Sequence, residues 1–387
     1  QPEIVQLLIE YGANIDKLTN DSLSSLYLGC SYGHAKIVNI LVAAGAKLDL
    51  PPGEKGHTPL MEAVNCGHSE IVKIIMDKNP NLLKSNIIEN NEKNETQLTE
   101  STNSKHSILN MACFRGHFEI VKYILQKSSS IGDNFTNDEL SHALLEACID
   151  GHADIAQLLI GLGCPVNFVE ESYESPLILA SNNGHVDLVK LLLDKGANVN
   201  ATNEEGVTAL MEASREGHLK LVQELIYRGA DVNIQIIDTG DTALSMASSC
   251  GWYDIVVKLA ESGANIEHAL NYSLIEASIF GHLNIVTYLV SIGADVNYIS
   301  PFSFDTPLIV ACENGNLEIV QYLIQNNATL ENSRKDKHSL LMAASSGGHL
   351  EIVRFLINLD VDINKKDPEN HHTALSLACL NGHINIV

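Results

Sequence analysis

The sequence predicts an all-α fold, a linear array of short helical hairpins stacked side by side. A Gly-His pair recurs along the chain, mostly 33 to 35 residues apart, and an apolar helical pattern follows each pair. This period is typical of helical repeat arrays, in which each hairpin buries its apolar face only against its neighbours. The pairs begin at Gly33, Gly67, Gly116, Gly151, Gly184, Gly217, Gly281, Gly348 and Gly382, with Gly251-Trp252 and Gly315-Asn316 in the gaps.

The stretch TALMEASREGHLKLV, which begins at Thr208, shows how one repeat is built. Thr208 is expected to cap the first helix, and in two other repeats the equivalent threonine precedes a proline, whose missing N–H costs nothing at that position. Gly217 ends the first helix because glycine tolerates positive φ. Gly229 ends the second helix. The apolar stripe of this helix consists of Leu221, Val222, Leu225 and Ile226.

Composition excludes several classes of partner. Aspartate and glutamate outnumber lysine and arginine 48 to 24, and the formal net charge of −24 repels a phosphate backbone. No apolar run approaches the roughly 18 residues of a membrane span, and QPEIVQLLIEYGANID lacks the pattern of a signal peptide. We therefore expect no nucleic-acid partner for this segment and no membrane partner.

Cysteines recur at one place in the repeat, directly after a small residue. This position suits a small buried hydrophobe, and the absence of C-x-x-C indicates a reducing compartment, the cytoplasm or the nucleus. The five cysteines at this position are Cys30, Cys113, Cys148, Cys312 and Cys379.

The motifs T-P-L-x-x-A, G-H-x-x-I-V and G-A-x-V-N together resemble ankyrin repeats over nearly the whole chain. The resemblance implies an ankyrin-repeat solenoid with finger loops on one edge and a concave face built from first helices. The usual histidine of T-P-L-H is absent throughout. The hydrogen bonds that this histidine supplies between repeats must therefore be replaced or missing.

Three segments are expected: ankyrin repeats over 1–79, a polar insertion over 80–105, and further repeats over 106–387. The insertion contains NIIENNEKNETQLTESTNSK, which has too little apolar content to fold alone, so we expect a disordered loop. A spacing of 30 residues shortens the finger loop in GANIEHALNYSLIEAS. Neither end carries a polar capping repeat, which predicts a fragment of a longer array with truncated first and last repeats.

Glutamate occupies one position of the first helix in alternate repeats, just before the small residue. A residue at this position lies roughly 200° from the core-facing leucine, so it should face the groove of stacked first helices. Consecutive acids would be ~16–20 Å apart, too far for a catalytic carboxylate pair, which works within about 10 Å. The acids are Glu62, Glu146, Glu212 and Glu276, and the apolar residues between them include Leu179 and Met246.

Two interpretations of the alternating acids stay open. The acids are contacts for a basic or mixed segment of a partner protein, with Leu179 and Met246 as apolar contacts. Alternatively, each is only stabilised by the helix dipole, and repeats were duplicated in pairs.

The ordered motifs PLMEA, ALLEACIDGH, ESPLILAS, TALMEASREGH, DTALSMAS and ANIEHALNYSLIEASIFGH resemble the first ankyrin array of the Mask family, proteins with multiple ankyrin repeats and a single KH domain. The resemblance implies a cytoplasmic and nuclear signalling scaffold linked to growth control and Yorkie-type transcriptional coactivators. RNA binding would belong to a KH domain outside this chain. The long insertion and the irregular repeat GNLEIVQYLIQNNATLENSRKDKHS depart from the family pattern.

Other constellations are weaker. The Gly-His histidines are rooted ~8–10 Å apart, whereas zinc needs nitrogens ~2.0–2.1 Å from one centre, so we interpret them as structural. Residues 53–56 spell the G-x-x-G of a KH domain without its helical context. No phosphate-binding, esterase or metalloprotease motif is present. We expect no metal, cofactor, small-molecule substrate or catalysis.

The loop asparagines Asn200, Asn233 and Asn297 resemble the site modified by the asparagine hydroxylase that acts on many ankyrin proteins. The competing interpretation is a turn asparagine that bonds its own backbone.

The function favoured is a non-enzymatic adaptor or scaffold that binds segments of other proteins along the concave face. One alternative is the targeting arm of an enzyme or channel whose active domain lies outside this chain. Another is a cytoskeletal adaptor, whose binding would survive charge reversal of the groove.

Overall fold

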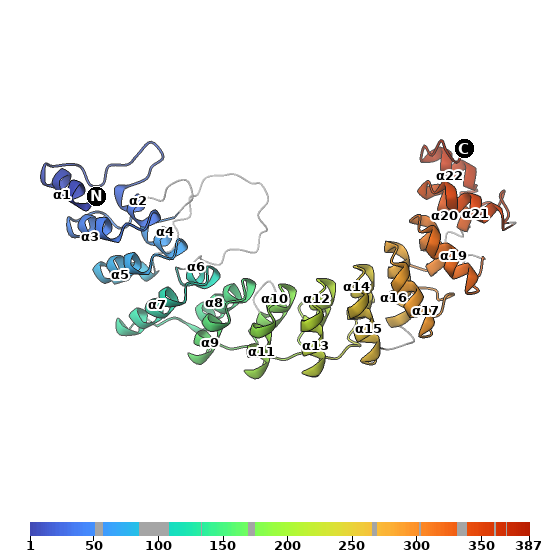
Figure 1. The fold of residues 1–387 in the computed structure, drawn as a ribbon, viewed down its shortest axis with the longest axis horizontal. Coiled ribbons are helices and arrows are strands. Elements are labelled where there is room, and N and C mark those ends of the chain that lie inside the picture. The colour runs from blue at the N-terminus through green and yellow to red at the C-terminus, as the bar shows by residue number, and fades with distance from the viewer. Residues whose placement is uncertain are drawn as a thin grey trace. The chain divides into compact units, whose positions relative to one another are not determined.

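The structure is a computed structural model that describes residues 1–50, 57–84, 108–132, 134–168, 175–264, 269–301, 303–330, 339–359, 361–368 and 370–387. Apart from an isolated β-bridge between Thr202 and Thr208, its regular elements are helical, as predicted. The chain forms two compact units, unit 1 from Gln1 to Ala197 and unit 2 from Asn198 to Val387. Figure 1 shows the paired helices of each unit.

Unit 1 contains one unpaired second helix, α1, followed by five helical pairs. Its helices are α1 (Pro2–Glu10), α2 (Ser25–Ser31), α3 (Ala35–Ala43), α4 (Pro59–Asn65), α5 (Ser69–Lys78), the 3-10 helix η1 (Pro80–Lys84), α6 (Ile108–Phe114), α7 (Phe118–Ser130), α8 (Asn137–Ile149), α9 (Ala153–Gly161), α10 (Pro176–Asn182) and α11 (Val186–Asp194).

Unit 2 continues the same alternation of first and second helices and finishes on a first helix. Its helices are α12 (Ala209–Arg215), α13 (Leu219–Tyr227), α14 (Ala243–Ser249), α15 (Tyr253–Glu261), α16 (Asn271–Phe280), α17 (Leu283–Ser291), α18 (Pro307–Glu313), α19 (Leu317–Gln325), α20 (Leu340–Gly347), α21 (Leu350–Ile357) and α22 (Ala374–Leu380).

The local signals in the sequence act as expected. The Thr208 hydroxyl accepts a hydrogen bond from the Met211 N–H at 3.2 Å and so caps α12. Pro59 and Pro307 stand at the start of α4 and α18 behind capping threonines. Gly217 has a φ of 84° and follows the end of α12. Capping and termination are therefore encoded within each repeat.

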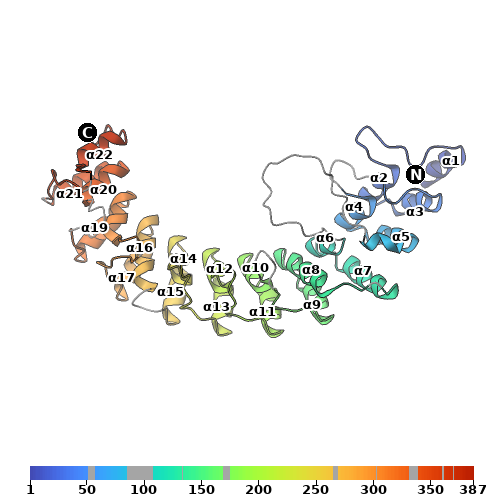
Figure 2. The same cartoon turned by 180° about the vertical axis from the view of Figure 1, so that it is seen from behind.

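Each unit has two rows of helices. The even-numbered first helices pack side by side along one row, and the odd-numbered second helices pack along the other; Figures 1 and 2 show the rows from opposite sides. Leucine, isoleucine, valine and alanine side chains fill the space between the rows. We call the side of the first helices that points away from the second helices the first-helix face.

In most Gly-His pairs the histidine is bonded to the preceding repeat. The His152 Nε2 lies 3.1 Å from the Phe114 carbonyl oxygen, and His282 Nε2 lies 2.9 Å from that of Ser249. Trp252 and Asn316 occupy the same position and donate N–H groups to Arg215 and Ser278 carbonyls at 2.8 Å. A carbonyl oxygen can only accept a hydrogen bond, so the histidines, like Trp252 and Asn316, must donate. They are therefore assigned the tautomer with a proton on Nε2.

These contacts supply hydrogen bonds between successive repeats. In these histidines Nε2 lies at hydrogen-bond distance from a carbonyl of the preceding repeat, which gives each side chain a structural role. Further bonds of the same kind join His68 to Ser31, His117 to Asn65, His185 to Ile149, His349 to Glu313 and His383 to Ser346.

The predicted cysteine slot is buried in four of its five repeats, at Cys30, Cys113, Cys148 and Cys312, and burial raises the pKa of the Cys30 thiol to about 12. The prediction is wrong for Cys379, which is exposed on α22, the last described helix, where packing by α20 covers one side. All eight cysteines are free.

The irregular repeats differ in helix length. The predicted insertion opens with η1, whose Leu82 is buried, so its first five residues are helical; residues 85–105 lie outside the described part. Helices α7 and α8 have 13 residues each, and α16 has 10. The G-x-x-G stretch at 53–56 and residues 265–268 of the shortened finger also lie outside the described residues.

Candidate protein-binding face

The position before the small residue lies on the first-helix face of successive repeats, but its exposure varies. Glu62 and Glu212 are 3% and 6% exposed, whereas Glu146 and Glu276 are half-buried. The predicted apolar contacts Leu179, on α10, and Met246, on α14, are also half-buried. The four acids therefore do not share one environment.

Glu62 on α4 is enclosed by donors from its own chain. His57 Nδ1 lies 3.0 Å from Glu62 Oε2, and the Ser31 hydroxyl donates to Oε1 at 3.4 Å. The Cys66 thiol and the Tyr27 hydroxyl also donate to this carboxylate. Burial by itself would raise the pKa of Glu62, but these hydrogen bonds outweigh burial and lower it.

Because α2 supplies Tyr27 and Ser31 while α4 supplies Glu62, the network joins two repeats. Burial and the Glu62 charge raise the pKa of Tyr27 to about 12. Glu62 thus has intramolecular partners that explain its charge without a second protein.

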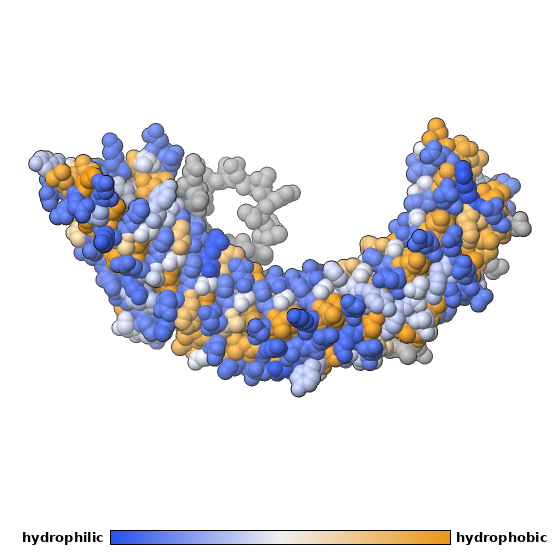
Figure 3. Space-filling model, viewed as in Figure 1, coloured by the Kyte–Doolittle hydropathy of each residue, from blue (hydrophilic) through white to orange (hydrophobic). Residues whose placement is uncertain are grey.

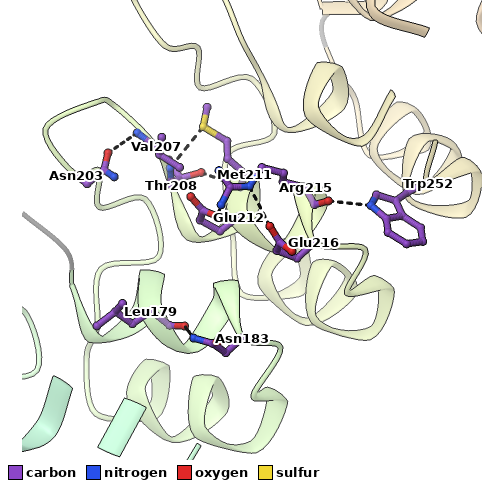
Figure 4. A network of polar contacts seen from close by, with 10 residues as sticks. All are labelled: Leu179, Asn183, Asn203, Val207, Thr208, Met211, Glu212, Arg215, Glu216 and Trp252. Carbon is purple, nitrogen blue, oxygen red and sulfur yellow. Dashed lines mark hydrogen bonds and ion pairs between the residues drawn. The ribbon is translucent and has the colours of Figure 1, made fainter. Parts of the chain in front are cut away.

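Glu212 on α12 is paired within its own helix. Arg215 Nη2 lies 2.6 Å from Glu212 Oε2, and Arg215 Nε lies 3.1 Å from Glu216 Oε1. The Arg215 carbonyl accepts a hydrogen bond from the Trp252 indole of the next repeat at 2.8 Å. Figure 4 shows this chain of contacts from Glu212 to Trp252. Arg215 is half exposed, so the pair still presents charge at the surface.

Glu276 on α16 faces another acid. Its pKa is raised to about 7, chiefly by burial and next by the Asp241 charge, while a hydrogen bond from Tyr272 lowers it. Asp241 immediately precedes the N-cap of α14 and accepts a hydrogen bond from the Ser245 hydroxyl at 3.1 Å. Glu276 therefore gains a proton more readily than an ordinary surface glutamate.

Glu146 on α8 lines a cavity of about 270 Å³ in unit 1. The cavity spans α4, α6 and α8, and Met111 and Phe114 are its apolar lining side chains. Arg115 Nε donates to Asn65 Oδ1 at 2.9 Å at its edge. The other lining residues are His57, Asn65 and Asn110. Such a hollow, apolar with a few polar groups, suits one side chain of a bound segment.

Sequence reasoning found Glu146 but missed His57, Asn110 and Arg115 in this cavity. One signal was available: His57 and Asp241 both directly precede a capping threonine, five residues before the position that holds Glu62 and Met246. Ionisable residues at that place lie beside the first-helix face. The Leu179 backbone carbonyl accepts a hydrogen bond from Asn183 Nδ2 at 3.0 Å, also drawn in Figure 4.

Hydrophobic and hydrophilic residues are interspersed over the side of each unit seen in Figure 3. The exposed large apolar side chains include Leu7 and Leu8 on α1, Ile237 in the finger before α14, and Leu380 and Ile384 on and after α22. Within the described part of the chain, no three His, Cys, Asp or Glu side chains are grouped to hold a metal ion. No described helix is long and apolar enough to cross a membrane.

The loop asparagines bridge repeats. Asn200 Oδ1 accepts from the Asp231 N–H at 2.9 Å, and Asn233 Nδ2 donates to the Gly263 carbonyl at 3.2 Å. Asn297 makes both kinds of bond, accepting from Thr329 N–H at 2.7 Å and donating to the Asn327 carbonyl.

The turn bond predicted for these asparagines is made by a different residue, two positions earlier. The backbone N–H of Asn200 donates to Asn198 Oδ1, that of Asn233 donates to Asp231 Oδ1, and that of Asn297 donates to Asp295 Oδ1. The loop asparagines are free to reach the next finger because the earlier residue satisfies the turn. Their hydroxylation stays a prediction.

Comparison with known proteins agrees with this architecture. The family described as Ankyrin repeats (3 copies) matches residues 1–86, 77–169, 144–236, 274–367 and 308–387. Ankyrin repeat and KH domain-containing protein mask-1 of Caenorhabditis elegans is 29% identical over 400 residues, which cover 99% of this chain and 14% of that protein. The chain therefore spans a small part of the length of this relative.

Two further relatives match shorter regions. Ankyrin repeat and KH domain-containing protein mask of Drosophila melanogaster is 37% identical over 111 residues, 28% of this chain and 3% of that protein. A transient receptor potential cation channel subfamily A member 1 homolog of Caenorhabditis elegans is 25% identical over 175 residues, 41% of this chain and 14% of the channel. Because the ankyrin family matches most of its length and the mask-1 similarity spans nearly all of it, the chain belongs to the ankyrin-repeat family and resembles the Mask proteins.

Proposed function

We propose that this chain is a non-enzymatic scaffold segment that binds parts of other proteins along its first-helix face. The observation that carries the proposal is the cavity beside Glu146, which combines an apolar lining with polar groups on three adjacent first helices. Rigid helices hold these side chains in place, so a bound segment pays little for ordering the site. Protein binding through a stacked surface is also what the ankyrin-repeat fold indicates.

The proposed contacts follow the exposure of each side chain. Glu146 and Glu276 are half-buried and would meet basic groups, while Leu179 and Met246 would meet apolar ones. Glu62 and Glu212 would act indirectly, Glu62 through His57 at the cavity and Glu212 through the exposed Arg215. The net charge of −24 favours basic partners by long-range attraction.

We further propose that the segment acts in intracellular growth-control signalling, in the cytoplasm and the nucleus. The resemblance to Mask proteins supports this assignment, and the eight free cysteines are consistent with a reducing compartment. Transcriptional coactivators or signalling proteins are the proposed partners.

The similarity to the cation channel homolog favours a second candidate, a targeting arm joined to a channel or enzyme. Sequence beyond Val387 separates the two proposals. Further repeats and a KH domain support the scaffold, and a membrane or catalytic domain supports the targeting arm.

The first test is affinity capture from a cell lysate with paired variants. Met111→Arg with Glu146→Lys alters the cavity, and Gln157→Arg with Asp154→Lys makes the same charge change on the exposed side of α9. We expect the affinity for captured partners to fall by about five-fold to 150-fold with the cavity variant, since losing one well-packed contact costs about 1–3 kcal/mol. The α9 variant should retain them.

Circular dichroism must show that both variants keep their helices. Equal capture by the folded cavity variant and the wild type would exclude this part of the face as the binding site. Such charge-insensitive binding is instead what a cytoskeletal adaptor predicts.

A further inference from the structure

Three of the alternating acids have different neighbours at the same repeat position. Glu62 is paired with His57 and Glu212 with Arg215, so each has a nitrogen base or cation of its own chain within 3.0 Å. Glu276 has a second carboxyl, Asp241, and the phenol of Tyr272 as its neighbours instead. Equivalent places in the array therefore differ in whether a negative charge is compensated.

The Asp241 and Glu276 side chains belong to neighbouring repeats. Asp241 ends the finger loop before α14, where its carbonyl accepts a hydrogen bond from Ile236 N–H at 2.8 Å. Glu276 lies on α16, which packs directly against α14. Any repulsion between the two carboxylates therefore acts across the junction of two first helices.

Burial makes this repulsion costly. Leu274 and Ile275, which precede Glu276, are buried, as are Ala277 and Ser278 after it, so the backbone there is firmly packed. Burial and the Asp241 charge together raise the pKa of Glu276 to about 7. Tyr272 donates a hydrogen bond that favours the charged form, without reversing the shift.

The groups around the pair come from each packed element. Tyr272 is on α16 itself, and Asp241 precedes α14. Tyr298 lies in the finger before α18 and contributes to the raised pKa of Tyr272. On the α17 side, His282 is bonded to the Ser249 carbonyl. Among the described residues, no lysine, arginine or histidine is recorded as acting on the Glu276 carboxyl.

We propose that the junction between α14 and α16 is a proton-sensitive joint of the array. In weakly acidic solution a proton on Glu276 removes the repulsion from Asp241, and the two first helices pack closely. When the proton leaves, the half-buried Glu276 carboxylate becomes charged beside α14, within the influence of the Asp241 charge, and the joint loosens. The first-helix face then also gains one negative charge at this repeat. Because Glu276 is also one of the proposed partner contacts, the joint is tested in the protein without a partner.

Hydrogen exchange measured by mass spectrometry tests the joint in the protein alone. Peptides from α14 and α16 are followed between pH 5.5 and 8.5, with exchange times corrected for the intrinsic pH dependence. The rise of the Glu276 pKa from 4.5 to about 7 would permit a fall in protection of roughly 300-fold. We expect a fall of about ten-fold over this pH range, because local opening loses only part of that energy. Peptides from α20 in the same unit should show no such change.

Glu276→Gln is the decisive variant because a glutamine resembles the protonated acid. Its α14 and α16 peptides should keep the high protection at every pH. Asp241→Asn, which removes the second charge, should reduce the pH response as well. Residues Glu267 and His268 lie just before α16 in the undescribed stretch, so His268→Gln serves as the matched control and should leave the response intact.

The proposal is overturned if wild-type protection does not change with pH, or if the change persists in Glu276→Gln. A response lost in His268→Gln would assign the sensor to that histidine and would equally overturn it. None of these outcomes bears on whether the first-helix face binds proteins.

Discussion

At the residue scale, Glu62 shows how a buried carboxylate stays charged. His57, Ser31, Cys66 and Tyr27 all offer hydrogen bonds to it, so the charge removed from water is compensated by donors of the protein. The equivalent Glu276 lacks this set and holds its proton to higher pH. Neighbouring side chains, and not the acid alone, decide the role of each position.

Replacing Glu62 with glutamine tests this compensation. Glu62→Gln should lower the free energy of unfolding at pH 7 by about 1–3 kcal/mol, because charged hydrogen bonds are lost and an amide N–H₂ faces donors. The folded pKa is lowered, so the stabilisation is present above the unfolded pKa of about 4.3 and is lost as the pH falls through the folded value.

Urea unfolding at pH 7 and pH 3 measures the effect, and the variant should approach the wild type at the lower pH. Glu70→Gln, an exposed acid on α5, is the matched control and should have little effect. A Glu62→Gln protein as stable at pH 7 as the Glu70→Gln protein would mean that the network contributes nothing.

At the element scale, two factors decide which residue can end a helix of the hairpin: the backbone angle φ and the contacts between repeats. Gly251 has a φ of 83°, and a Cβ added there would lie 2.6 Å from His282 Cε1 of the next repeat. Gly263 has a similar φ of 91°, but nothing lies within 4 Å of its added Cβ. The first glycine is required both for its conformation and for the ring that covers it.

The pair allows a double-mutant test. Gly263→Ala should cost about 1–2 kcal/mol from positive φ alone, and Gly251→Ala should cost more because it also displaces the His282 ring. In a His282→Ala background, the added cost of Gly251→Ala should fall to that of Gly263→Ala. Denaturant unfolding of the four variants measures these differences. An unchanged cost in that background would show that the ring contact has no role.

Much of each element could be predicted from the sequence because its determinants are local. Thr208, Gly217 and the apolar stripe of α13 act within one repeat, at the positions expected. The ion pair between Glu212 and Arg215 could also be predicted from the sequence, since the two residues are three apart on one helix. The insertion, predicted to be a disordered loop from residue 80, instead begins with the helix η1, in which Leu82 is buried.

Contacts between repeats could not be predicted in the same way. Asp241 and Glu276 are far apart in the sequence and meet only because α14 packs on α16. The cavity beside Glu146 depends on the relative sizes of side chains from three helices. The loop asparagines bridge to the next finger because another residue already satisfies their own turn. All three features depend on how neighbouring repeats stack.

At the scale of the whole molecule, the array is a series of similar joints, and its stability is a sum of repeats and junctions. Within each unit, the second helices supply packing and the histidine bonds, while the first helices present varied side chains. A surface made of repeated positions can thus be specific, since each position carries a different residue. Binding is expected to follow the first helices in both units.

The most direct measurement is photo-crosslinking with p-benzoylphenylalanine placed at one position at a time. Met111 and Met246 sample the first-helix face of the two units, and the exposed Gln157 and Asp254 sample α9 and α15. If the first-helix face binds partners, crosslinked products should form from Met111 and Met246 and be absent from Gln157 and Asp254. Crosslinks that form chiefly from Gln157 and Asp254 would contradict the central claim.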